Sequence, residues 1–280
     1  MLGGWWTFLR AIIVASPTLD RVRLPNGVVR LQAGGPALYA GFALRSLGYE
    51  VCALGTYGRL VSPTLKLESS LGIRRICCEG RGEGYVFAHY YDPGSPARRS
   101  TIESVSGPLT ADDLYSALKE CDPDLVIISP VYSEVPPELL GSSALRGRRV
   151  SVDVQGFSRS LGDGWWERLS PEHVSLVHLS NDDAGESVAE SLARKFPNVL
   201  YTVGPGGALI YVGGKVTAVP SPQGNELLED RTGAGDVMLA LVSHRFLMQG
   251  LPLDEAYLRS QEDFLEIMRR LSKAKVLGQS

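Results

Sequence analysis

Short apolar runs separated by polar segments recur along most of the chain. The first run, Ala11–Ala15, is rich in β-branched residues and is closed by Ser16-Pro17, which predicts a buried strand. Later runs of similar character are mostly separated by helical or loop material: 51–54, 125–128, 150–153, 176–179 and 200–203. This alternation is typical of a mostly parallel sheet flanked by helices, so we expect an α/β fold.

Two other segments alternate between apolar and polar residues and predict strands with one wet face. Arg21–Leu31 alternates around Asn26-Gly27, which is a strong hairpin signal. The segment from about 73 to 103 contains strand-like runs with polar turns. Because an apolar sheet face needs cover, we expect both segments to form a small sheet that serves as a lid over a ligand or as a dimer surface. The expected organisation is one domain over 1–280 with a discontinuous lid from about 20–33 and 73–103.

Three helices are predicted by their boundaries and periodicity. Gly34-Gly35-Pro36 opens the first, with proline in the first turn, where its missing N–H is not needed, and Leu47-Gly48 ends it. Asp236–Gln249 is long and carries an apolar stripe, while Leu253–Lys275 is amphipathic and charged.

Composition excludes several functional classes. The 280 residues are 44% hydrophobic and 21% charged, as in ordinary globular proteins. A formal net charge of -3 gives no broad cationic field, so neither a nucleic acid nor a membrane is an expected partner. The apolar start of the chain lacks a basic region and is interrupted by Arg10, and no stretch approaches the roughly 20 apolar residues of a membrane helix. These features predict a cytoplasmic protein.

The four cysteines, Cys52, Cys77, Cys78 and Cys121, form no C-x-x-C pair and lie at no zinc-ligand spacing from a histidine. Structural disulfides are uncommon in the cytosol, so we expect reduced thiols. A bridge from Cys77 or Cys78 to another element stays open.

The clearest candidate for chemistry is the run Asp230-Arg-Thr-Gly-Ala-Gly-Asp236. Two glycines around a small residue at a helix start allow successive backbone N–H groups to converge on an anion, and the helix dipole adds about half a positive charge there. Such an arrangement suits the charge that develops on a transferring phosphoryl group. Asp236, in the first helical turn, is then held ionised and can accept a proton from a substrate hydroxyl.

Simpler interpretations explain this run less well. An Asp cap on a glycine-rich loop accounts for Gly235-Asp236 but needs neither Gly233 nor Thr232. No Lys-Ser or Lys-Thr follows the glycines, which excludes a Walker A loop, and Gly34-Gly35 lacks the spacing of a dinucleotide fingerprint. The run is therefore interpreted as a phosphoryl-transfer site with Asp236 as its base.

With these residues the chain resembles the ribokinase (PfkB) family of sugar, nucleoside and polyol kinases. The run 230–236 is similar to the family's C-terminal signature, and Gly34-Gly35 with Leu47-Gly48 is similar to its N-terminal one. Thr202–Ala208 is similar to the T-x-G-x-x-G-A segment that borders the nucleotide. The resemblance covers roughly residues 11 to 250. It implies a Rossmann-like, mostly parallel sheet with a small β lid, and it implies ATP and Mg²⁺ as cofactors.

The resemblance also implies roles for individual residues. Asp236 would be the catalytic base, beside an anion hole formed by Gly233, Ala234 and Gly235. The ATP site would be lined by Thr202, Gly204, Gly207 and Thr232. The acceptor side would include Asp20, Gly34, Gly35 and Tyr39. Asp20 would hydrogen-bond substrate hydroxyls, unless it merely caps a turn after Pro17.

Magnesium binding rests on Ser180-Asn-Asp-Asp183, which stands where the family has N-x-x-E. Asp183 falls in the place of the Glu and is predicted to order Mg²⁺ through water. Ser180 replaces the Asn, and 181–183 as a plain helix cap is an open alternative.

Departures from the family pattern bear on the substrates. Tyr39 replaces the Asn that commonly follows the double glycine in ribokinases, so ribose is not favoured. Segments 104–110 and 151–159 resemble an archaeal subset near myo-inositol kinases, in which the substrate or its phosphate would be faced by Asp153, Gln155 and Arg159. A loop that makes only internal hydrogen bonds is the alternative. The charged segment after 253 differs from the family's alanine-rich helix and leaves the choice of nucleotide open.

The predicted function is therefore an ATP-dependent transfer of a phosphoryl group to a hydroxyl of a small sugar or polyol, with a myo-inositol-like acceptor favoured. A nucleoside or vitamin-precursor kinase of the same fold and a non-catalytic sensor that binds a nucleotide or sugar are alternatives. The intact Asp236 argues against a sensor, because a binding protein has no need of a base. A homodimer through the lid is a further option.

Overall fold

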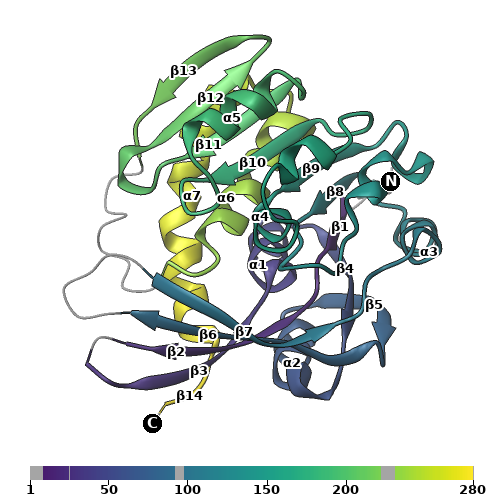
Figure 1. Ribbon diagram of the computed structural model, residues 1–280, viewed down its shortest axis with the longest axis vertical. Helices are drawn as coiled ribbons and strands as arrows, with labels where there is room; N and C mark the ends of the chain where they lie inside the picture. Colours follow the sequence, from purple (N-terminus) through teal and green to yellow (C-terminus); the bar gives the residue numbers. More distant parts are fainter. Residues whose placement is uncertain (1–8, 25, 92–97, 222–230, 280) are drawn as a thin grey trace, which may run out of the picture.

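The computed structural model describes residues 9–24, 26–91, 98–221 and 231–279. Nine strands form one sheet, the large sheet: β1 (Arg10–Val14), β4 (Glu50–Tyr57), β5 (Ile73–Glu79), β8 (Leu125–Ile128), β9 (Arg149–Asp153), β10 (Leu176–Ser180), β11 (Asn198–Thr202), β12 (Ala208–Val212) and β13 (Lys215–Val219). Their order within the described residues is β13-β12-β11-β10-β9-β8-β1-β4-β5 (Figure 1). Neighbouring strands from β5 to β11 pair in parallel, while β12 and β13 add an antiparallel edge.

The apolar runs predicted as strands all lie in the large sheet. They are buried along nearly their whole length, because helices cover both faces of the sheet. The predicted mostly parallel α/β sheet is confirmed.

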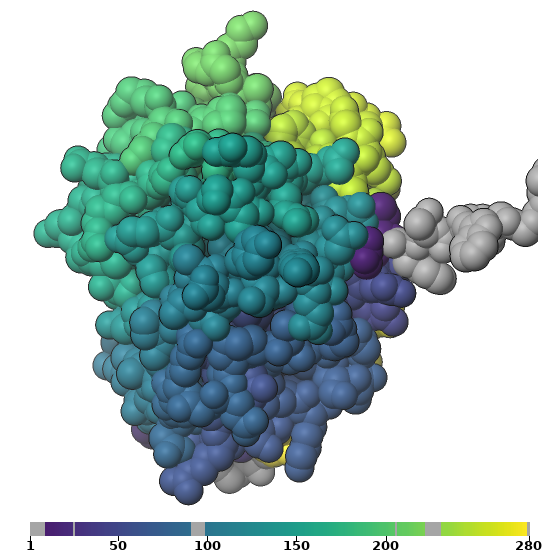
Figure 2. Space-filling view, turned by 90° about the vertical axis from the view of Figure 1, so that its right-hand side faces the viewer, coloured from purple at the N-terminus to yellow at the C-terminus, as the bar shows by residue number. Residues whose placement is uncertain are grey.

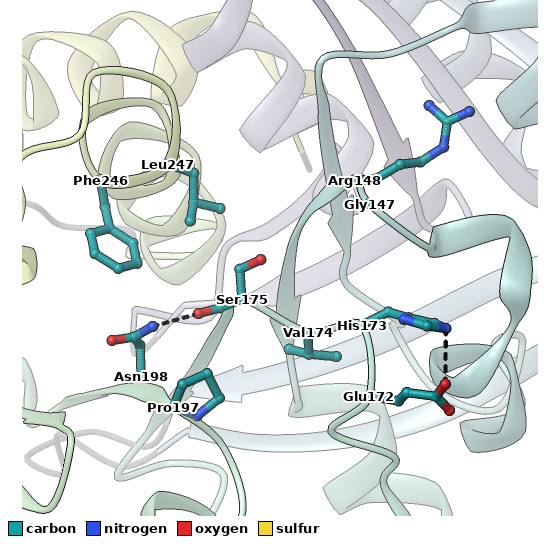
Figure 3. Close-up of a pocket in the computed structure, with 10 residues that line it drawn as sticks. All are labelled: Gly147, Arg148, Glu172, His173, Val174, Ser175, Pro197, Asn198, Phe246 and Leu247. Carbon is teal, nitrogen blue, oxygen red and sulfur yellow. Dashed lines mark hydrogen bonds and ion pairs between the residues drawn. The ribbon is translucent and has the colours of Figure 1, made fainter.

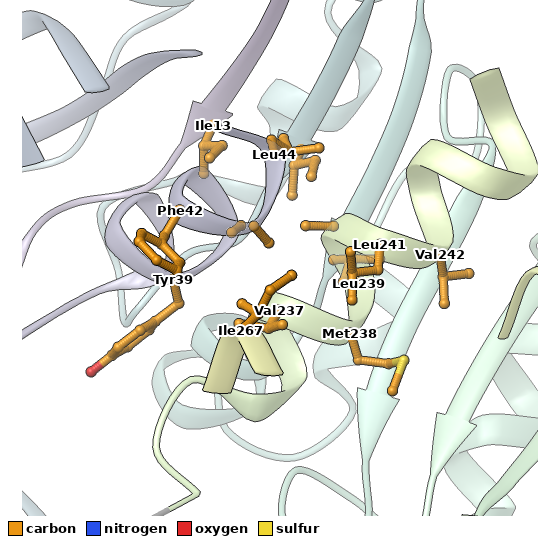
Figure 4. Close-up of a cluster of buried hydrophobic side chains, with 14 of the residues drawn as sticks. Ile13, Tyr39, Phe42, Leu44, Val237, Met238, Leu239, Leu241, Val242 and Ile267 are labelled. Atoms are coloured by element: carbon orange, nitrogen blue, oxygen red, sulfur yellow. The ribbon is translucent and has the colours of Figure 1, made fainter. Parts of the chain in front are cut away.

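Helices pack on the large sheet from both sides. One face carries α1 (Pro36–Ser46), α6 (Ala234–Ser243) and α7 (Leu253–Ala274), and the other carries α3 (Ala111–Cys121), α4 (Gln155–Ser160) and α5 (Glu186–Ala193). Figure 4 shows Phe42 of α1, Val237 of α6 and Ile267 of α7 in one apolar cluster. The remaining helices of the described residues are α2 (Ser62–Ser70), η1 (Arg59–Val61), η2 (Pro137–Gly141), η3 (Ser143–Leu145), η4 (Trp165–Arg168), η5 (Gly204–Gly206) and the π-helical turn η7 (His244–Met248).

A second sheet, the small sheet, lies in the lower part of Figure 1. The predicted hairpin around Asn26-Gly27 supplies β2 (Thr18–Arg23) and β3 (Val29–Gly34), which pair antiparallel. The second half-polar segment supplies β6 (Gly82–Tyr91) and β7 (Arg98–Ser106), and β14 (Val276–Gln279) follows α7. The order is β14-β3-β2-β6-β7, so segments distant in sequence meet in this sheet.

The composition of the small sheet differs from the expected segments 20–33 and 73–103 at two strands. β5 pairs with β4 at the edge of the large sheet and is not part of the small one. An edge strand of a large sheet also has one wet face, so its half-polar pattern could not separate the two locations. β14, which pairs with β3, was not expected because four residues after a long helix carry too little pattern to predict a strand.

A buried ion pair fastens β5 to α2. The guanidinium of Arg75 donates to both carboxylate oxygens of Glu68, at 2.7 and 2.9 Å, and the two side chains are 8% and 1% exposed. Arg75 also donates to the carbonyl of Ala15, at the end of β1. Removal of either charge would therefore leave the other one buried and unpaired.

Arg75→Met is expected to lower the free energy of unfolding by about 3–5 kcal/mol, because Glu68 would remain as an uncompensated buried carboxylate. Urea unfolding followed by circular dichroism measures this loss. Arg59→Met is the matched control, since the pair between Arg59 and Glu83 is exposed and such pairs contribute about 0–1 kcal/mol. Similar losses in the two variants would contradict the prediction.

The structure pairs the four cysteines, whereas reduced thiols were expected. Cys52 of β4 is bonded to Cys121 at the end of α3, with their Cα atoms 6.3 Å apart, and the adjacent Cys77 and Cys78 are bonded to each other. The Cα separation of the first pair lies in the usual range for disulfides. The sequence could not indicate this pair, because only the packing of α3 beside β4 brings its members together.

In the part of the chain that the structure describes, no helix combines the length and apolarity needed to cross a bilayer. The β12–β13 hairpin projects at the top of Figure 2, where Val212 and Val216 of these strands are exposed. Single exposed apolar side chains of this kind are ordinary and indicate no partner.

Candidate active site

Polar side chains gather at the carboxyl ends of the strands of the large sheet. β1 has β4 on one side and β8 on the other, and open α/β sheets bind ligands at such points, where the order of strand addition reverses. Ser129 follows β8, Asp153 ends β9 and Thr202 ends β11. His178 of β10 lies beside Asp153 in the register of the two strands. The candidate site is built where these strand ends meet the start of α6.

Gly233 shapes the loop that leads into α6. It caps the helix with a φ of 87°, in the left-handed region that favours glycine. A Cβ at this position would lie 2.3 Å from the ring of Tyr39, so the loop rests directly on that ring. Asp230, the first residue of the motif, lies outside the described residues. Glycine is thus required at 233 by both conformation and close approach.

The backbone N–H groups of this loop are unequal as anion donors. The N–H of Ala234, a predicted member of the anion hole, donates to the carbonyl of Arg231 at 3.0 Å. Among the described residues, the N–H groups of Gly233, Gly235 and Asp236 have no backbone acceptor. The last two belong to the first turn of α6, at the positive end of its dipole, and are therefore the better donors to an anion.

The carboxylate of Asp236 is enclosed at the start of α6. The residue is 7% exposed, and its Oδ1 accepts hydrogen bonds from Ser129 Oγ at 3.0 Å and from Gln155 Nε2 at 3.3 Å. The Gln155 amide also donates to Ser129 Oγ, so the three side chains form one cluster. These bonds fix the orientation of the carboxylate and leave its Oδ2 for another partner.

The surroundings of Asp236 adjust its acidity. Burial raises the pKa of Asp236, and the charge of Asp153 raises it further. The Ser129 hydrogen bond and the positive charges of His178 and Arg159 act in the opposite direction, and the resulting pKa is about 7. A carboxyl group with this pKa gains and loses its proton near neutrality, as a general base must.

A buried chain of hydrogen bonds supports the loop from below. Asp153 Oδ2 is 2.6 Å from His178 Nδ1, while its Oδ1 accepts the N–H of Gln155. His178 Nε2 is 3.1 Å from Thr202 Oγ1. Burial lowers the pKa of His178, but the hydrogen bond and charge of Asp153 outweigh it, so the pKa is raised. Both carboxylate oxygens of Asp153 form hydrogen bonds within the protein. The sequence left two options for Asp153, contact with the substrate or internal hydrogen bonds only, and these bonds match the second option.

Asp183 and Arg159 place opposite charges near Asp236. Asp183 Oδ2 accepts the N–H and the hydroxyl of Ser180, at 2.9 and 2.7 Å. Burial and the charge of Asp153 raise the pKa of Asp183, and Arg159 opposes them. The exposed Arg159 side chain thus acts electrostatically on both Asp183 and Asp236, and its guanidinium donates to the Val131 carbonyl.

The carboxylates of the site suit a hydrated magnesium ion. Mg²⁺ usually keeps several waters and is held by one or two carboxylates together with substrate phosphates. Within the described ranges, these carboxylates do not converge into a set of three close ligand atoms. Asp183 therefore fits contact with a hydrated ion better than membership of an all-protein cage. Helix α5 is capped by Gly185, so residues 181–183 are not its cap.

The buried face of the small sheet carries polar side chains. Asp20, 3% exposed, accepts a hydrogen bond from Thr18 Oγ1 at 2.7 Å, and a Cβ on Gly34 would lie 2.3 Å from atoms of both. Gln32 faces Asp20 across the β2–β3 pair, and His89 Nε2 is 3.9 Å from Asp20 Oδ2. Gln32 is 1% exposed, and neither polar atom of its amide has a hydrogen-bond partner among the residues that the structure describes. Buried amides are normally hydrogen-bonded, so the polar row of Asp20, Gln32 and His89 suits a polar ligand.

The remaining predicted residues surround this centre. Gly35 caps α1, and Tyr39 is 2% exposed beneath the 231–236 loop, where it supports Gly233. Gly204 begins the turn η5, and Gly207 follows it with its Cα packed closely against the Val219 carbonyl. Thr232 directly precedes Gly233.

Four residues of the site were not expected from the sequence: Ser129, His178, Gln32 and His89. Ser129 ends a fully apolar run and His178 interrupts one, so a search for polar residues at such places would have found both. Gln32 and His89 lie in half-polar strands. Alternation there does not tell which polar residues lie on the buried face.

A hollow of about 390 Å³ opens at the opposite ends of the same strands (Figure 3). Its lining includes residues 147–148 and 172–175, which precede β9 and β10, and residues 197–198 at the start of β11. It therefore lies at the amino ends of the strands, away from Asp236. None of the predicted site residues lines it, so chemistry and geometry identify the other end of the sheet as the candidate active site.

Comparison with known proteins gives a result for the fold. No protein-family model and no curated protein matches the chain. A pyrophosphate-dependent kinase in the ribokinase family, complexed with a pyrophosphate analog and myo-inositol, matches with a TM-score of 0.75 at 18% identity, covering 92% of this chain and 95% of that one. A nucleoside kinase of Burkholderia thailandensis in complex with inosine has a TM-score of 0.69 at 19% identity, covering 94% of this chain and 97% of that one. Ribokinase of Thermotoga maritima matches with a TM-score of 0.66 at 16% identity, covering 95% of this chain and 100% of that one. The structural neighbours of this chain are kinases of the ribokinase family, and the chain has their fold.

Proposed function

We propose that the protein is a phosphotransferase that moves a phosphoryl group from a phosphoanhydride donor to a hydroxyl of a small sugar or polyol. The observation that carries the proposal is the buried Asp236 carboxylate at the amino end of α6, in the same turn as the available N–H groups of Gly235 and Asp236. A base and an anion site in contact with each other are what transfer of a phosphoryl group to a hydroxyl requires.

Each group of the site has one task in this reaction. Asp236 accepts the proton of the acceptor hydroxyl, while Ser129 and Gln155 orient its carboxylate. The N–H groups of Gly235 and Asp236 bind the phosphoryl oxygens on which charge develops. Arg159 contacts the phosphate of the donor or product. Asp183 would hold a hydrated Mg²⁺ through water, and the ion would supply charge neutralisation for the phosphates.

The small sheet is proposed as a lid over the acceptor. Its polar row of Asp20, Gln32 and His89 offers donors and acceptors to neighbouring hydroxyls, and closure over the site would exclude water from the transfer. A cyclic polyol such as myo-inositol has this chemistry, and a similar solved structure contains myo-inositol. A homodimer through the outer face of this sheet stays a prediction.

ATP is the first candidate for the donor, with Thr202, Gly204, Gly207 and Thr232 beside the nucleotide. Pyrophosphate is the second candidate, because three of the similar solved structures are described in terms of a pyrophosphate-dependent kinase. The Asp236 site is the same for both, since each donor presents a terminal phosphoryl group on a phosphoanhydride.

The proposal is tested by incubating the purified protein with Mg²⁺ and either ATP or pyrophosphate against inositols, aldoses, ketoses and nucleosides. Phosphorus NMR identifies any new phosphate ester. A phosphorylated sugar or polyol is the expected product. If only a nucleoside is phosphorylated, the acceptor is a nucleoside and the proposed sugar or polyol acceptor is wrong. Tight nucleotide binding without transfer to any acceptor would refute the proposal and favour a sensor.

The rate should depend on pH through Asp236. The base must be deprotonated, so kcat/KM is expected to rise about tenfold per pH unit below its pKa of about 7 and to level off above it. Ser129→Ala removes a hydrogen bond that lowers this pKa, and should move the inflection to higher pH. A kcat/KM profile across neutrality checks both statements. An inflection near the ordinary aspartate value of about 4 would contradict them.

A further inference from the structure

A lysine is enclosed behind the 231–236 loop. Lys275, between α7 and β14, is only 1% exposed, as is typical of the few buried lysines that have partners in the interior. Its Nζ donates to the carbonyl oxygen of Thr232 at 3.2 Å and lies 5.4 Å from the centre of the Tyr39 ring. Thr232 belongs to the loop, and Tyr39 is the ring on which Gly233 rests. The ammonium group therefore contacts the loop and its support at once.

The backbone around Lys275 is fixed from two sides. Its N–H donates to the carbonyl of Leu271 in α7, and its carbonyl accepts the N–H of Ala33 in β3. The carbonyl of Ala33 in turn accepts the hydroxyl of Tyr39 at 3.4 Å. The position of the ammonium thus follows from the packing of α7 and the small sheet, and it does not depend on a flexible surface side chain.

We propose that Lys275 is a positioning residue for phosphoryl transfer at this loop, a role that rests on the proposed function. The Thr232 carbonyl lies four residues before Asp236, so it is the oxygen to which the Asp236 N–H would donate in an uninterrupted helix. Lys275 holds this oxygen, while the Asp236 N–H has no backbone acceptor among the described residues. That N–H lacks a helical acceptor because α6 begins after Gly233, and Lys275 fixes the carbonyl of the loop residue that directly precedes Gly233.

The charge of Lys275 has a second effect on the same loop. The ammonium donates to the Thr232 carbonyl and so places a positive charge next to the loop that carries the amides. Electrostatic stabilisation from a group already in place costs no reorganisation during the reaction. An apolar side chain of the same length would fill this space without the desolvation cost of a buried cation, so packing alone does not account for a lysine.

Lys275→Met keeps most of the length of the unbranched side chain and removes its charge. It is expected to lower kcat about 10- to 100-fold while KM for the acceptor stays within about threefold, because Lys275 acts through the loop and touches no substrate. Lys273→Met is the matched control, since Lys273 is exposed two residues earlier. A kcat for Lys275→Met within about threefold of this control would overturn the proposal.

Lys275→Ala separates the charge from the packing and keeps the test available if the Met variant does not fold. Added ethylammonium is expected to raise the kcat of the Ala variant at least about fivefold, whereas equal concentrations of ethanol or sodium chloride are not. Thermal melting confirms that the protein assayed is folded. Folded Lys275→Ala protein that ethylammonium does not reactivate would overturn the proposal.

Failure of this inference can be told from failure of the proposed function by the wild-type protein, which is assayed first. A wild type that transfers phosphate to no acceptor refutes the proposed function, and the role of Lys275 is refuted with it. An active wild type with indifferent Lys275 variants refutes the positioning role alone.

Discussion

Asp236→Asn is expected to lower kcat about 10³-fold and to leave the protein folded. The amide has nearly the shape of the carboxylate and can still accept the hydrogen bond of Ser129, so the geometry of the site is retained. It cannot accept the proton of the acceptor hydroxyl, and general base catalysis contributes typically 10² to 10⁴ in rate. Steady-state kinetics with the best acceptor measures the effect.

The control for this prediction is the binding of the donor. Neutralising a buried carboxylate near the donor phosphates should not weaken donor binding, so the Kd measured by calorimetry should be equal to or lower than that of the wild type. The melting temperature should also not fall, because Asp236 is a buried acid whose ionised form is disfavoured by its surroundings. A variant that retains kcat within a few-fold would show that another group takes the proton.

Gly233→Ala is expected to lower kcat about 10²- to 10³-fold, the effect of losing donors that stabilise developing charge. The new Cβ would lie 2.3 Å from the Tyr39 ring, on a residue whose φ is 87°. The loop must therefore move, and the N–H groups of Gly235 and Asp236 move with it. Rate measurements at saturating donor and acceptor test the effect on the transfer step.

Gly214→Ala is the matched control for the conformational part of this effect. Gly214 also has a positive φ, 81°, but a Cβ there meets no atom within 4 Å. Both alanine variants should lose about 1–2 kcal/mol of stability for the left-handed conformation, and only Gly233→Ala should lose activity. Equal activity in the two variants would contradict the role of the loop as an anion site.

The fold was predictable wherever a pattern is local and unambiguous. Leu125–Ile128 is apolar at every position because helices cover both sides of the strand, and such a run has few other interpretations. The half-polar strand β5 was assigned to the wrong sheet, since one wet face is equally typical of a lid strand and of the edge of a large sheet. The pattern states how a strand is exposed, but not which partner it has.

Some residues of the site could likewise be predicted from a local motif, and others could not. Asp236 and its glycines could be proposed as base and anion site from the sequence, because one helix start brings a carboxylate and glycine N–H groups together within a few residues. Ser129, His178 and Lys275 reach that start from three other parts of the chain. Their role depends on strand register and helix packing, which a single sequence does not display.

The pairing of Gln32 with Val276 also sets the order in which the molecule is completed during synthesis. The strands of the large sheet have all left the ribosome before β14 does, and they can already pair. Until residue 276 emerges, β3 is an unprotected edge and Thr232 lacks the lysine that holds its carbonyl. A nascent chain therefore forms the large sheet first and completes the support of the 231–236 loop last. We expect a chain that ends before Lys275 to be compact but inactive.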